Sequence, residues 1–398
     1  MKITALETLR TEEFSNVLWV RVHTDAGLVG LGETFYGARS VQAHIHDVLA
    51  GRLLGRDPLR IEAINRDMVN LPMAQSSTGA EYRAASAIDI ALWDLFGKAC
   101  GQPVHQMLGG LCHDRVRVYN TCAGYGYVRS NRIRPVDTWN FSSDGPYEDL
   151  QAFMTDAGAL AESLLEQGIT GMKIWPFDPA AIANNGLFIT AEQMRDAVRP
   201  FEQIRKAVGD RMEIMVEFHC LWNLPTAKKI AKVLEDYAPT WYEDPIRMNS
   251  PQALAEYARS TDVWVCASET LGSRWPYKDM LEKDATHVVM ADLCWTGGLT
   301  EGRKIAALAE TWHRPFAPHD CTGPVGFIAA VHASLSQPNT LIQESVRAFY
   351  TGWYKELVTA VPRIENGYVY PMEGAGLGVE LLPEVFRRSD LHVERSEL

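Results

Sequence analysis

The pattern of apolar and polar positions at the start of the chain predicts a small α+β domain. Two runs of strand-forming residues flank the turn Asp25-Ala26-Gly27, so residues 17–33 are expected to form a β-hairpin. Helical periodicity follows the hairpin, and its longest amphipathic stretch ends near Gly101 and Pro103. The helical segments cover residues 40–53, 58–69 and 81–108.

From about Val116 the pattern changes to short apolar strands separated by helical segments. Because parallel neighbours need crossover connections, this alternation predicts a parallel sheet closed into a (β/α) barrel. From about Gly367 the sequence becomes irregular again and contains Gly and Pro. The eight predicted strands are Val116–Asn120, Gly171–Ile174, Glu213–Glu217, Thr240–Glu243, Trp264–Glu269, His287–Asp292, Pro315–His319 and Thr340–Glu344.

Composition and charge narrow the class of protein. The 398 residues are 46% hydrophobic and 22% charged, which is enough apolar surface for a folded, compact chain. The net charge of −12 argues against nucleic acid or an anionic membrane as a partner, and we expect neither. Seven scattered cysteines without a C-x-x-C pair, and no signal-peptide or membrane-spanning pattern, predict a cytoplasmic protein with reduced thiols.

Polar side chains stand at or near the ends of consecutive barrel strands. Glu217, Glu243 and Glu269 follow one another at equal intervals of 26 residues, and the next strands end in Asp292, His319 and Glu344. The carboxyl ends of barrel strands share one face, so these side chains should converge at one mouth. A single strand-end glutamate is more often a solvated cap or an ion-pair partner. The regular series favours a functional site.

Three carboxylates brought close together require a cation between them to remain ionised. Hard oxygen ligands without Cys or His favour Mg²⁺. We therefore predict one Mg²⁺ per active site, held by Glu217, Glu243 and Glu269.

Together with these strand ends, the segment from Ala85 to Lys98 (ASAIDIALWDLFGK), followed by Pro103, resembles the enolase superfamily in its mandelate racemase-like branch. The resemblance implies a modified TIM barrel, (β/α)₇β, under an N-terminal α+β capping domain that the C-terminal tail completes. It also implies Mg²⁺-assisted removal of the proton α to a carboxylate, with an enediolate intermediate. The expected boundaries are residues 1–115 for the cap, 116–360 for the barrel and 361–398 for the tail packing back on the cap.

His319 is the expected base, because imidazole titrates near neutral pH. Asp292 would hydrogen-bond its other nitrogen and fix the tautomer; the alternative for His319 is a structural histidine. Lys173 stands where the branch's racemases begin a Lys-x-Lys motif, but Trp175 replaces the second lysine, which weakens a racemase interpretation. Lys173 is expected either to contact the substrate carboxylate or a metal ligand, or to be a buried lysine neutralised by Glu217.

The motif Glu217-Phe218-His219 is similar to an Asp-x-His motif of acid-sugar dehydratases of the galactonate type, in which the histidine protonates the departing β-hydroxyl. Since residues two apart on a strand face the same way, His219 is expected to point into the mouth. The alternatives are a packing residue or a hydrogen-bond donor to substrate. Glu344 resembles the family's electrophile, which donates to the substrate carboxylate, so its pKa is expected to be raised.

Two departures from the family pattern concern metal binding and specificity. The first metal ligand is usually Asp, whereas this chain has Glu217, and the specificity loop at Leu9–Asn16 is short. Substrate choice is therefore expected to fall to Trp175, Asp178, Trp222 and the long segment Gly124–Pro146, a candidate lid. Three arginines of that segment either pair with a second carboxylate of a diacid or are solvated: Arg129, Arg132 and Arg134.

The predicted function is a Mg²⁺-dependent dehydratase of a sugar acid, an aldonate or aldarate, that yields a 2-keto-3-deoxy acid. The alternative is a racemase, epimerase or cycloisomerase of a 2-hydroxy or sugar acid with the same enediolate chemistry. A non-enzyme alternative is a barrel that has lost activity and serves as a binding or structural protein. The expected partners are a small-molecule carboxylate substrate and further copies of the chain in a homo-oligomer.

Overall fold

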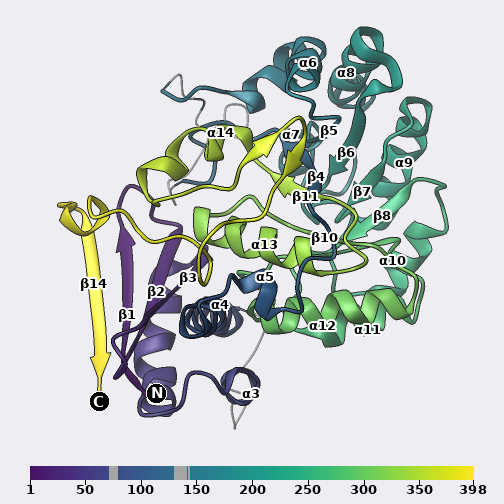
Figure 1. The fold of residues 1–398 in the computed structure, drawn as a ribbon. Coiled ribbons are helices and arrows are strands. Elements are labelled where there is room, and N and C mark those ends of the chain that lie inside the picture. The colour runs from purple at the N-terminus through teal and green to yellow at the C-terminus, as the bar shows by residue number, and fades with distance from the viewer. Residues whose placement is uncertain (71–78, 130–140, 142–143) are drawn as a thin grey trace.

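The computed structural model describes residues 1–70, 79–129, 141 and 144–398. A four-stranded antiparallel sheet and a long helix form one part of the molecule, and a barrel of strands and helices forms the other (Figure 1). None of the helices in these ranges combines the length and the apolarity that crossing a membrane would require.

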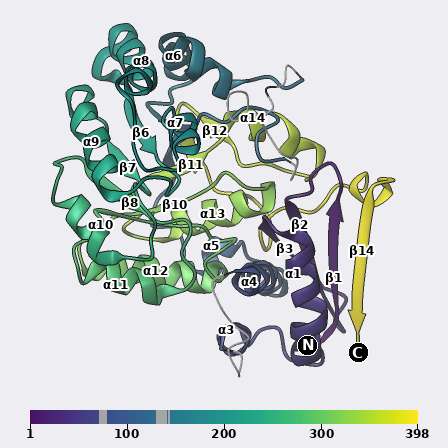
Figure 2. The same ribbon diagram turned by 180° about the vertical axis from the view of Figure 1, so that it is seen from behind.

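The capping sheet has the strand order β14-β1-β2-β3. Its strands are β1 (Ile3–Thr11), β2 (Val17–Thr24), β3 (Val29–Phe35) and β14 (Leu391–Glu397). The predicted hairpin is confirmed as β2 and β3, which pair from Val17↔Phe35 to His23↔Val29. The C-terminal tail completes this sheet as expected, because β14 pairs with β1 over seven residues and lies beside it in both views (Figures 1 and 2).

The long predicted helix is α4 (Ala80–Cys100), and it packs directly on β3. Glycine makes this close approach possible, because a Cβ added to Gly30 or Gly32 would lie about 2 Å from the carbonyl oxygen of Ala91 or Ala87. The other cap helices are short: α1 (Ala38–His44), a π-turn (Ile45–Leu49), α2 (Ala50–Leu53), α3 (Ile61–Val69) and α5 (Val104–Met107).

In the described residues, eight parallel strands close into a barrel. Strands β4 to β10 pair in sequence order, β11 pairs with β4, and a bridge between Phe316 and Thr340 joins β10 to the segment leading into β11. All eight lie within or next to the predicted positions: β4 (Val116–Thr121), β5 (Gly171–Ile174), β6 (Glu213–Glu217), β7 (Trp241–Glu243), β8 (Trp264–Ala267), β9 (Val288–Ala291), β10 (Phe316–Pro318) and β11 (Gln343–Ser345).

Helices surround this barrel, and side chains fill its interior. A separate apolar cluster that includes Tyr119, Met215, Trp241 and Met290 comes from the inward positions of the strands. Helix α13 is buried over its whole length. The helices are α6 (Asp149–Glu166), α7 (Asp178–Ala183), α8 (Ala191–Val208), α9 (Leu224–Leu234), α10 (Pro251–Ala258), α11 (Arg274–Leu281), α12 (Gly298–Thr311), α13 (Pro324–Ser336) and α14 (Arg347–Tyr350).

The tail contacts the barrel before it returns to the cap. Strands β12 (Ile364–Glu365) and β13 (Tyr368–Val369) form a hairpin, and β13 pairs with β4. Further on, Asp94 of α4 accepts hydrogen bonds from the backbone nitrogens of Leu31 and Leu377. The boundaries at 115/116 and 360/361 stay a prediction.

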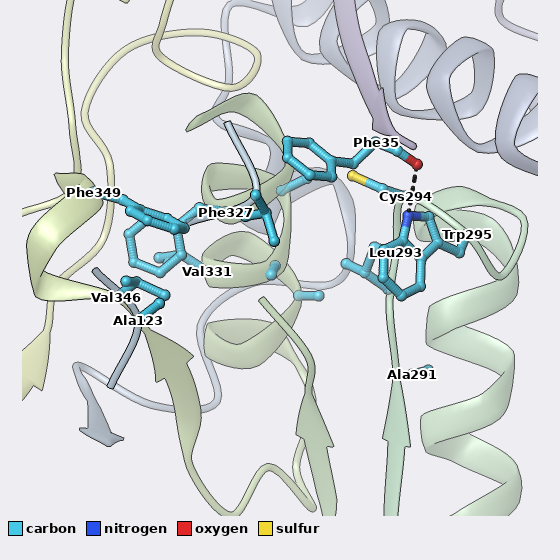
Figure 3. Packing of buried hydrophobic residues seen from close by; sticks show 14 of the residues in the cluster. Phe35, Ala123, Ala291, Leu293, Cys294, Trp295, Phe327, Val331, Val346 and Phe349 are labelled. Carbon is cyan, nitrogen blue, oxygen red and sulfur yellow. Dashed lines mark hydrogen bonds between the residues drawn. The ribbon is translucent and has the colours of Figure 1, made fainter. Parts of the chain in front are cut away.

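The cap and the barrel are joined at a point close to the barrel mouth. The indole nitrogen of Trp295, which follows β9, donates to the carbonyl oxygen of Phe35 at 3.1 Å (Figure 3). The hydroxyl of Thr34 donates to the carbonyl of Cys294 at 2.7 Å. The end of β3 is therefore fixed against the loop that follows Asp292.

Candidate active site

The carboxyl ends of the barrel strands surround a cavity of about 270 Å³. Glu217 and Glu243 end β6 and β7, and Glu269 lies two residues beyond β8. Asp292 and His319 directly follow β9 and β10. The cavity is lined by Tyr36, Thr121, Tyr127, Val128, Lys173, Trp175, Asp178, Ile182, Glu217, His219, Leu221, Glu269, Trp295, His319 and Cys321.

Three glutamates can hold a metal ion. One carboxylate oxygen from each of Glu217, Glu243 and Glu269 lies within 4.8 Å of the other two. Burial raises the pKa of all three carboxyl groups. The Oε2 atoms of Glu217 and Glu269 accept no hydrogen bond from the described residues. These buried hard oxygens fit a divalent cation, which would compensate their charge.

Lys173, on β5, lies among the carboxylates. Its Nζ forms an ion pair with Glu243 and lies 2.8 Å from Glu344 Oε1 and 3.6 Å from Glu217 Oε2. Although burial opposes the shift, Glu243 and Glu344 raise the pKa of Lys173 well above its usual value. Lys173 thus stays charged, and Glu217 is the most distant of its three partners.

His319 and Asp292 form a hydrogen-bonded pair. Nδ1 of His319 lies 2.7 Å from Asp292 Oδ2, while the backbone nitrogen of Cys294 donates to Asp292 Oδ1. The carboxylate therefore accepts the Nδ1 proton, leaving Nε2 of His319 as the basic nitrogen, 3.2 Å from Glu269 Oε2. Burial opposes the shift, but Glu269 and Glu344 raise the pKa of His319 well above its usual value. A metal cation bound by the glutamates would lower the pKa of His319 again, because its positive charge would oppose theirs.

His219 forms a second pair, with Asp178. Nδ1 of His219 lies 2.7 Å from Oδ2 of Asp178, the first residue of α7. Against the effect of burial, Asp178 and Glu217 raise the pKa of His219 to about 10. We expected the His219 side chain to point into the mouth because residues two apart on a strand face the same way. That argument is wrong, because β6 ends at Glu217 and His219 lies beyond the strand, with φ +48°. A turn places its ring at the cavity, and its backbone nitrogen donates to Glu217 Oε1.

Trp175 occupies the position of the missing second lysine and forms part of the cavity wall. Its ring meets the imidazole of His219 edge to face, with centroids 5.8 Å apart. Tyr127 and Phe153 pack against it at 5.4 and 5.3 Å. The indole therefore provides a fixed aromatic surface beside His219, with no basic group of its own.

The expectation of a raised pKa for Glu344 is wrong. Burial would raise it, but Lys173 and His319 lower the pKa of Glu344 below its usual value. Its oxygens accept hydrogen bonds from the hydroxyl of Thr121 and from the backbone nitrogen of Asp320. These contacts favour the ionised form of Glu344, which accepts hydrogen bonds and pairs with Lys173.

The other predicted substrate-binding residues in the described ranges are not among those that line the cavity. Trp222 follows the lining residue Leu221, is buried, and forms a backbone bridge with Ile246. The guanidinium of Arg129 pairs with Glu13 and does not line the cavity. Arg132 and Arg134 lie outside the described residues.

Several lining residues were not singled out from the sequence. Trp295 is one, and its ring lies 5.3 Å from that of His319. Trp295 comes three residues after Asp292, and Thr121 is the last residue of β4. Both therefore lie next to strand ends at the barrel mouth, and this position in the sequence could have identified them. Tyr36 comes from the cap and carried no such signal. Tyr127 and Val128 belong to the predicted specificity segment.

Sequence and structure comparisons agree with this geometry. Residues 156–385 match the enolase C-terminal domain-like family, and residues 3–109 match the N-terminal domain of the mandelate racemase/muconate lactonizing enzyme family. D-galactonate dehydratase of Pectobacterium atrosepticum is 30% identical and covers 100% of this chain and 95% of its own. D-galactonate dehydratase of Variovorax paradoxus is 31% identical, and the alignment covers 96% of this chain and 92% of the relative.

Solved structures give the same result. An enolase of the mandelate racemase subgroup from Agrobacterium tumefaciens is 48% identical, with a TM-score of 0.88, covering 100% of this chain and 99% of its own. An enolase protein from Sargasso Sea environmental sequencing is 43% identical over the same shares, with a TM-score of 0.88. The chain is an enzyme of the enolase superfamily and belongs to its mandelate racemase-like branch.

Proposed function

We propose that this enzyme is a Mg²⁺-dependent dehydratase that converts an aldonic acid into the corresponding 2-keto-3-deoxy acid. The observation that carries the proposal is a pair of carboxylate-bound imidazoles, His219 after β6 and His319 after β10. These strands are four apart in an eight-stranded barrel, so they stand opposite each other. In barrel order, Glu217 shares β6 with His219, and Glu243 and Glu269 belong to the next two strands on the way to His319.

His319 fits the role of base. With its Nδ1 proton donated to Asp292, its Nε2 atom can take the proton from the carbon next to the substrate carboxylate. That carbon acid is weak, so the negative charge that develops must be stabilised. A Mg²⁺ ion held by Glu217, Glu243 and Glu269 would supply Lewis-acid stabilisation of that charge. Lys173, buried beside these ligands, adds a fixed positive charge.

His219 fits the role of acid. Hydroxide is a poor leaving group, so the 3-hydroxyl needs a proton as the C–O bond breaks, and it then departs as water. His219 is charged when it holds that proton, and Asp178 stabilises the charged form. The remaining enol gains a proton at C3 and becomes the 2-keto acid. The substrate loses one hydrogen and one hydroxyl, and the atoms balance as one water.

Two observations favour a monoacid. Among the described lining residues, Lys173 is the one lysine or arginine, and three carboxylates surround it already, so in this part of the chain a second substrate carboxylate would find no free lysine or arginine partner. The curated relatives described above are also named for an aldonate, D-galactonate.

A panel of aldonic and aldaric acids tests the proposal. Purified enzyme with Mg²⁺ should form an α-keto acid from at least one aldonate, detected as its semicarbazone. Formation of keto acid from none of the acids would refute the dehydratase, and a preference for aldarates would refute the assigned substrate class.

Epimerisation is the second candidate, favoured by the likeness of the two pairs, since each could remove a proton from one face of the same carbon. Turnover in D₂O separates the two reactions. An epimerase incorporates deuterium at the α-carbon and inverts it without release of water, whereas a dehydratase forms the keto acid.

A further inference from the structure

Besides His219, two residues that line the cavity have a backbone conformation that L-amino acids rarely adopt. Tyr36, which follows β3, has φ +65°, and Val128, in the segment after β4, has φ +49°. For a β-branched residue such as Val128 this conformation is a clear outlier. Such conformations persist only where neighbouring groups hold them in place.

One residue, Asn16, is hydrogen-bonded to both of these residues. Its backbone oxygen accepts a hydrogen bond from the Tyr36 nitrogen at 2.9 Å, and its Nδ2 donates to the Val128 oxygen at 2.7 Å. Asn16 is buried, and its Oδ1 accepts no hydrogen bond from any described residue. An unsatisfied buried oxygen is unfavourable, so the role of the side chain is its donation to Val128.

The neighbours of Asn16 hold the same segment along its length. Glu13 pairs with Arg129, whose guanidinium lies 4.8 Å from the ring of Phe14 and 4.7 Å from that of Tyr125. The turn between β1 and β2 is thus attached to residues 125–129 by an ion pair, one cation–π contact (Arg129 on Phe14) and the Asn16 hydrogen bond.

We propose that Asn16 is a positioning residue for substrate recognition, which fixes Tyr36 of the cap and Val128 of the barrel as two walls of one cavity. Asn16 does not itself line the cavity, so it acts through these two residues. The proposal rests on the proposed function, because it places a sugar acid in this cavity. The base, the acid and the glutamates stand on other strands, so loss of the Asn16 hydrogen bond should weaken substrate binding more than it slows the chemical step.

Asn16→Leu tests the proposal, because it keeps the size of the side chain and removes both the donor and the unsatisfied oxygen. With D-galactonate and D-gluconate as probes, KM should rise about tenfold while kcat changes by less than about threefold. Mg²⁺ affinity, measured by calorimetry without acid, should not change. A fall in kcat with unchanged KM would indicate a merely structural role and would overturn the proposal.

Two further substitutions at Val128 test whether its backbone conformation is what Asn16 holds in place. In the Asn16→Leu background, Val128→Gly should lower KM by at least about threefold, because glycine adopts φ +49° without being held. Val128→Ala removes nearly the same side-chain atoms but keeps the strain, so it should not rescue binding. Equal effects of the two would contradict the proposal. Should Asn16→Leu not fold, Arg129→Met loosens the same attachment and should raise KM to a smaller extent.

Calorimetric binding of the two acids in the presence of Mg²⁺ separates this inference from the function. If an acid binds, no acid of the panel gives a keto acid and Asn16→Leu weakens the binding, the dehydratase is refuted and the role of Asn16 stands. If turnover occurs and KM is unchanged in the variant, the role of Asn16 is refuted and the dehydratase stands. If the unmodified enzyme binds none of the acids of the panel, both are refuted.

Discussion

Nδ1 of His219 lies 2.7 Å from Oδ2 of Asp178, the same separation that joins His319 to Asp292. The two pairs differ in their surroundings. Each imidazole lies beside a tryptophan ring, Trp295 for His319 and Trp175 for His219, but the Nε2 atom of His319 also lies 3.2 Å from Oε2 of Glu269. A functional difference between the pairs, one taking a proton and the other giving one, can therefore be tested by substitution.

His219→Asn should separate the two halves of the reaction. Without the acid, the 3-hydroxyl leaves slowly, and we expect dehydration to fall by about 10²–10⁴-fold. Removal of the α-proton depends on His319, so exchange of that proton with solvent in D₂O should continue at a rate within about tenfold of the unmodified enzyme. NMR follows both rates in one sample. A parallel loss of exchange and dehydration would contradict the assignment.

Asp292→Asn should slow both halves of the reaction. A carboxylate can only accept a hydrogen bond and therefore keeps the proton on Nδ1 of His319, whereas an amide can also donate. In the variant, His319 can carry its proton on Nε2, which is the wrong tautomer for a base. Exchange and dehydration should both fall by about 10²-fold or more. The matched control is Asp178→Asn, which changes the partner of the other histidine and should slow dehydration while exchange continues.

Mg²⁺ binding can be tested by two substitutions on the same strand. Glu217 ends β6 at the cavity, whereas Glu213 begins it and pairs with Arg117. Glu217→Gln removes a predicted ligand and should weaken Mg²⁺ binding by at least about tenfold, while Glu213→Gln should leave it unchanged. After chelation, Mg²⁺ should raise the melting temperature of the unmodified protein and of Glu213→Gln. Equal Mg²⁺ affinities in the two variants would exclude Glu217 as a ligand.

The sequence predicted the barrel well, because its signals are local. Strands such as β8 (WVCA) and β9 (VVMA) are short apolar runs, and a polar residue at or just beyond the strand end marks the mouth. The cap was predicted less completely, because β1 and β14 are far apart in sequence and recognise each other only in the folded protein. The exposed residues of β14 also lack an apolar pattern that would predict a strand.

Within the site, the sequence identified the glutamates, the two histidines and Asp292 as the partner of His319, but not the partner of His219. Nothing in the sequence places Asp178 beside His219, 41 residues later. The pKa of Glu344 was predicted in the wrong direction because Lys173 and His319 reach it from other strands. Arg129 was chosen for its charge, and its partner Glu13 could be recognised only in three dimensions.

The contact between β3 and α4 should make Gly32 intolerant of a side chain. A Cβ there would lie 1.9 Å from the carbonyl oxygen of Ala87, so the strand and the helix would have to separate. We expect Gly32→Ala to destabilise the protein by about 1–3 kcal/mol, measured by urea unfolding. A Cβ added to Gly51, in α2, would have no atom within 4 Å, so Gly51→Ala should be neutral or stabilising by up to about 1 kcal/mol. Equal losses would contradict the packing argument.

His332 should make the protein less stable in acid. It is fully buried in α13, where its Nδ1 accepts from the backbone nitrogen of His105 and its Nε2 donates to the carbonyl of Leu377. Burial lowers the pKa of His332 from 6.5 to about 3, and burial also lowers the pKa of His105, whose ring stacks on it. The folded protein therefore excludes a proton that the unfolded chain binds below about pH 6.5.

The sign and size of the effect follow from that difference in proton binding. Between pH 6.5 and about 3 the unfolded state binds the proton first, so His332 reduces the free energy of unfolding by up to about 1.4 kcal/mol for each unit of pH decrease. His332→Gln can keep one donor and one acceptor but does not titrate, so its stability should fall less steeply between pH 7 and 4 in urea unfolding. His313→Asn, at an exposed position, should follow the unmodified protein. Parallel curves for His332→Gln and the unmodified protein would show that His332 takes up its proton equally in both states.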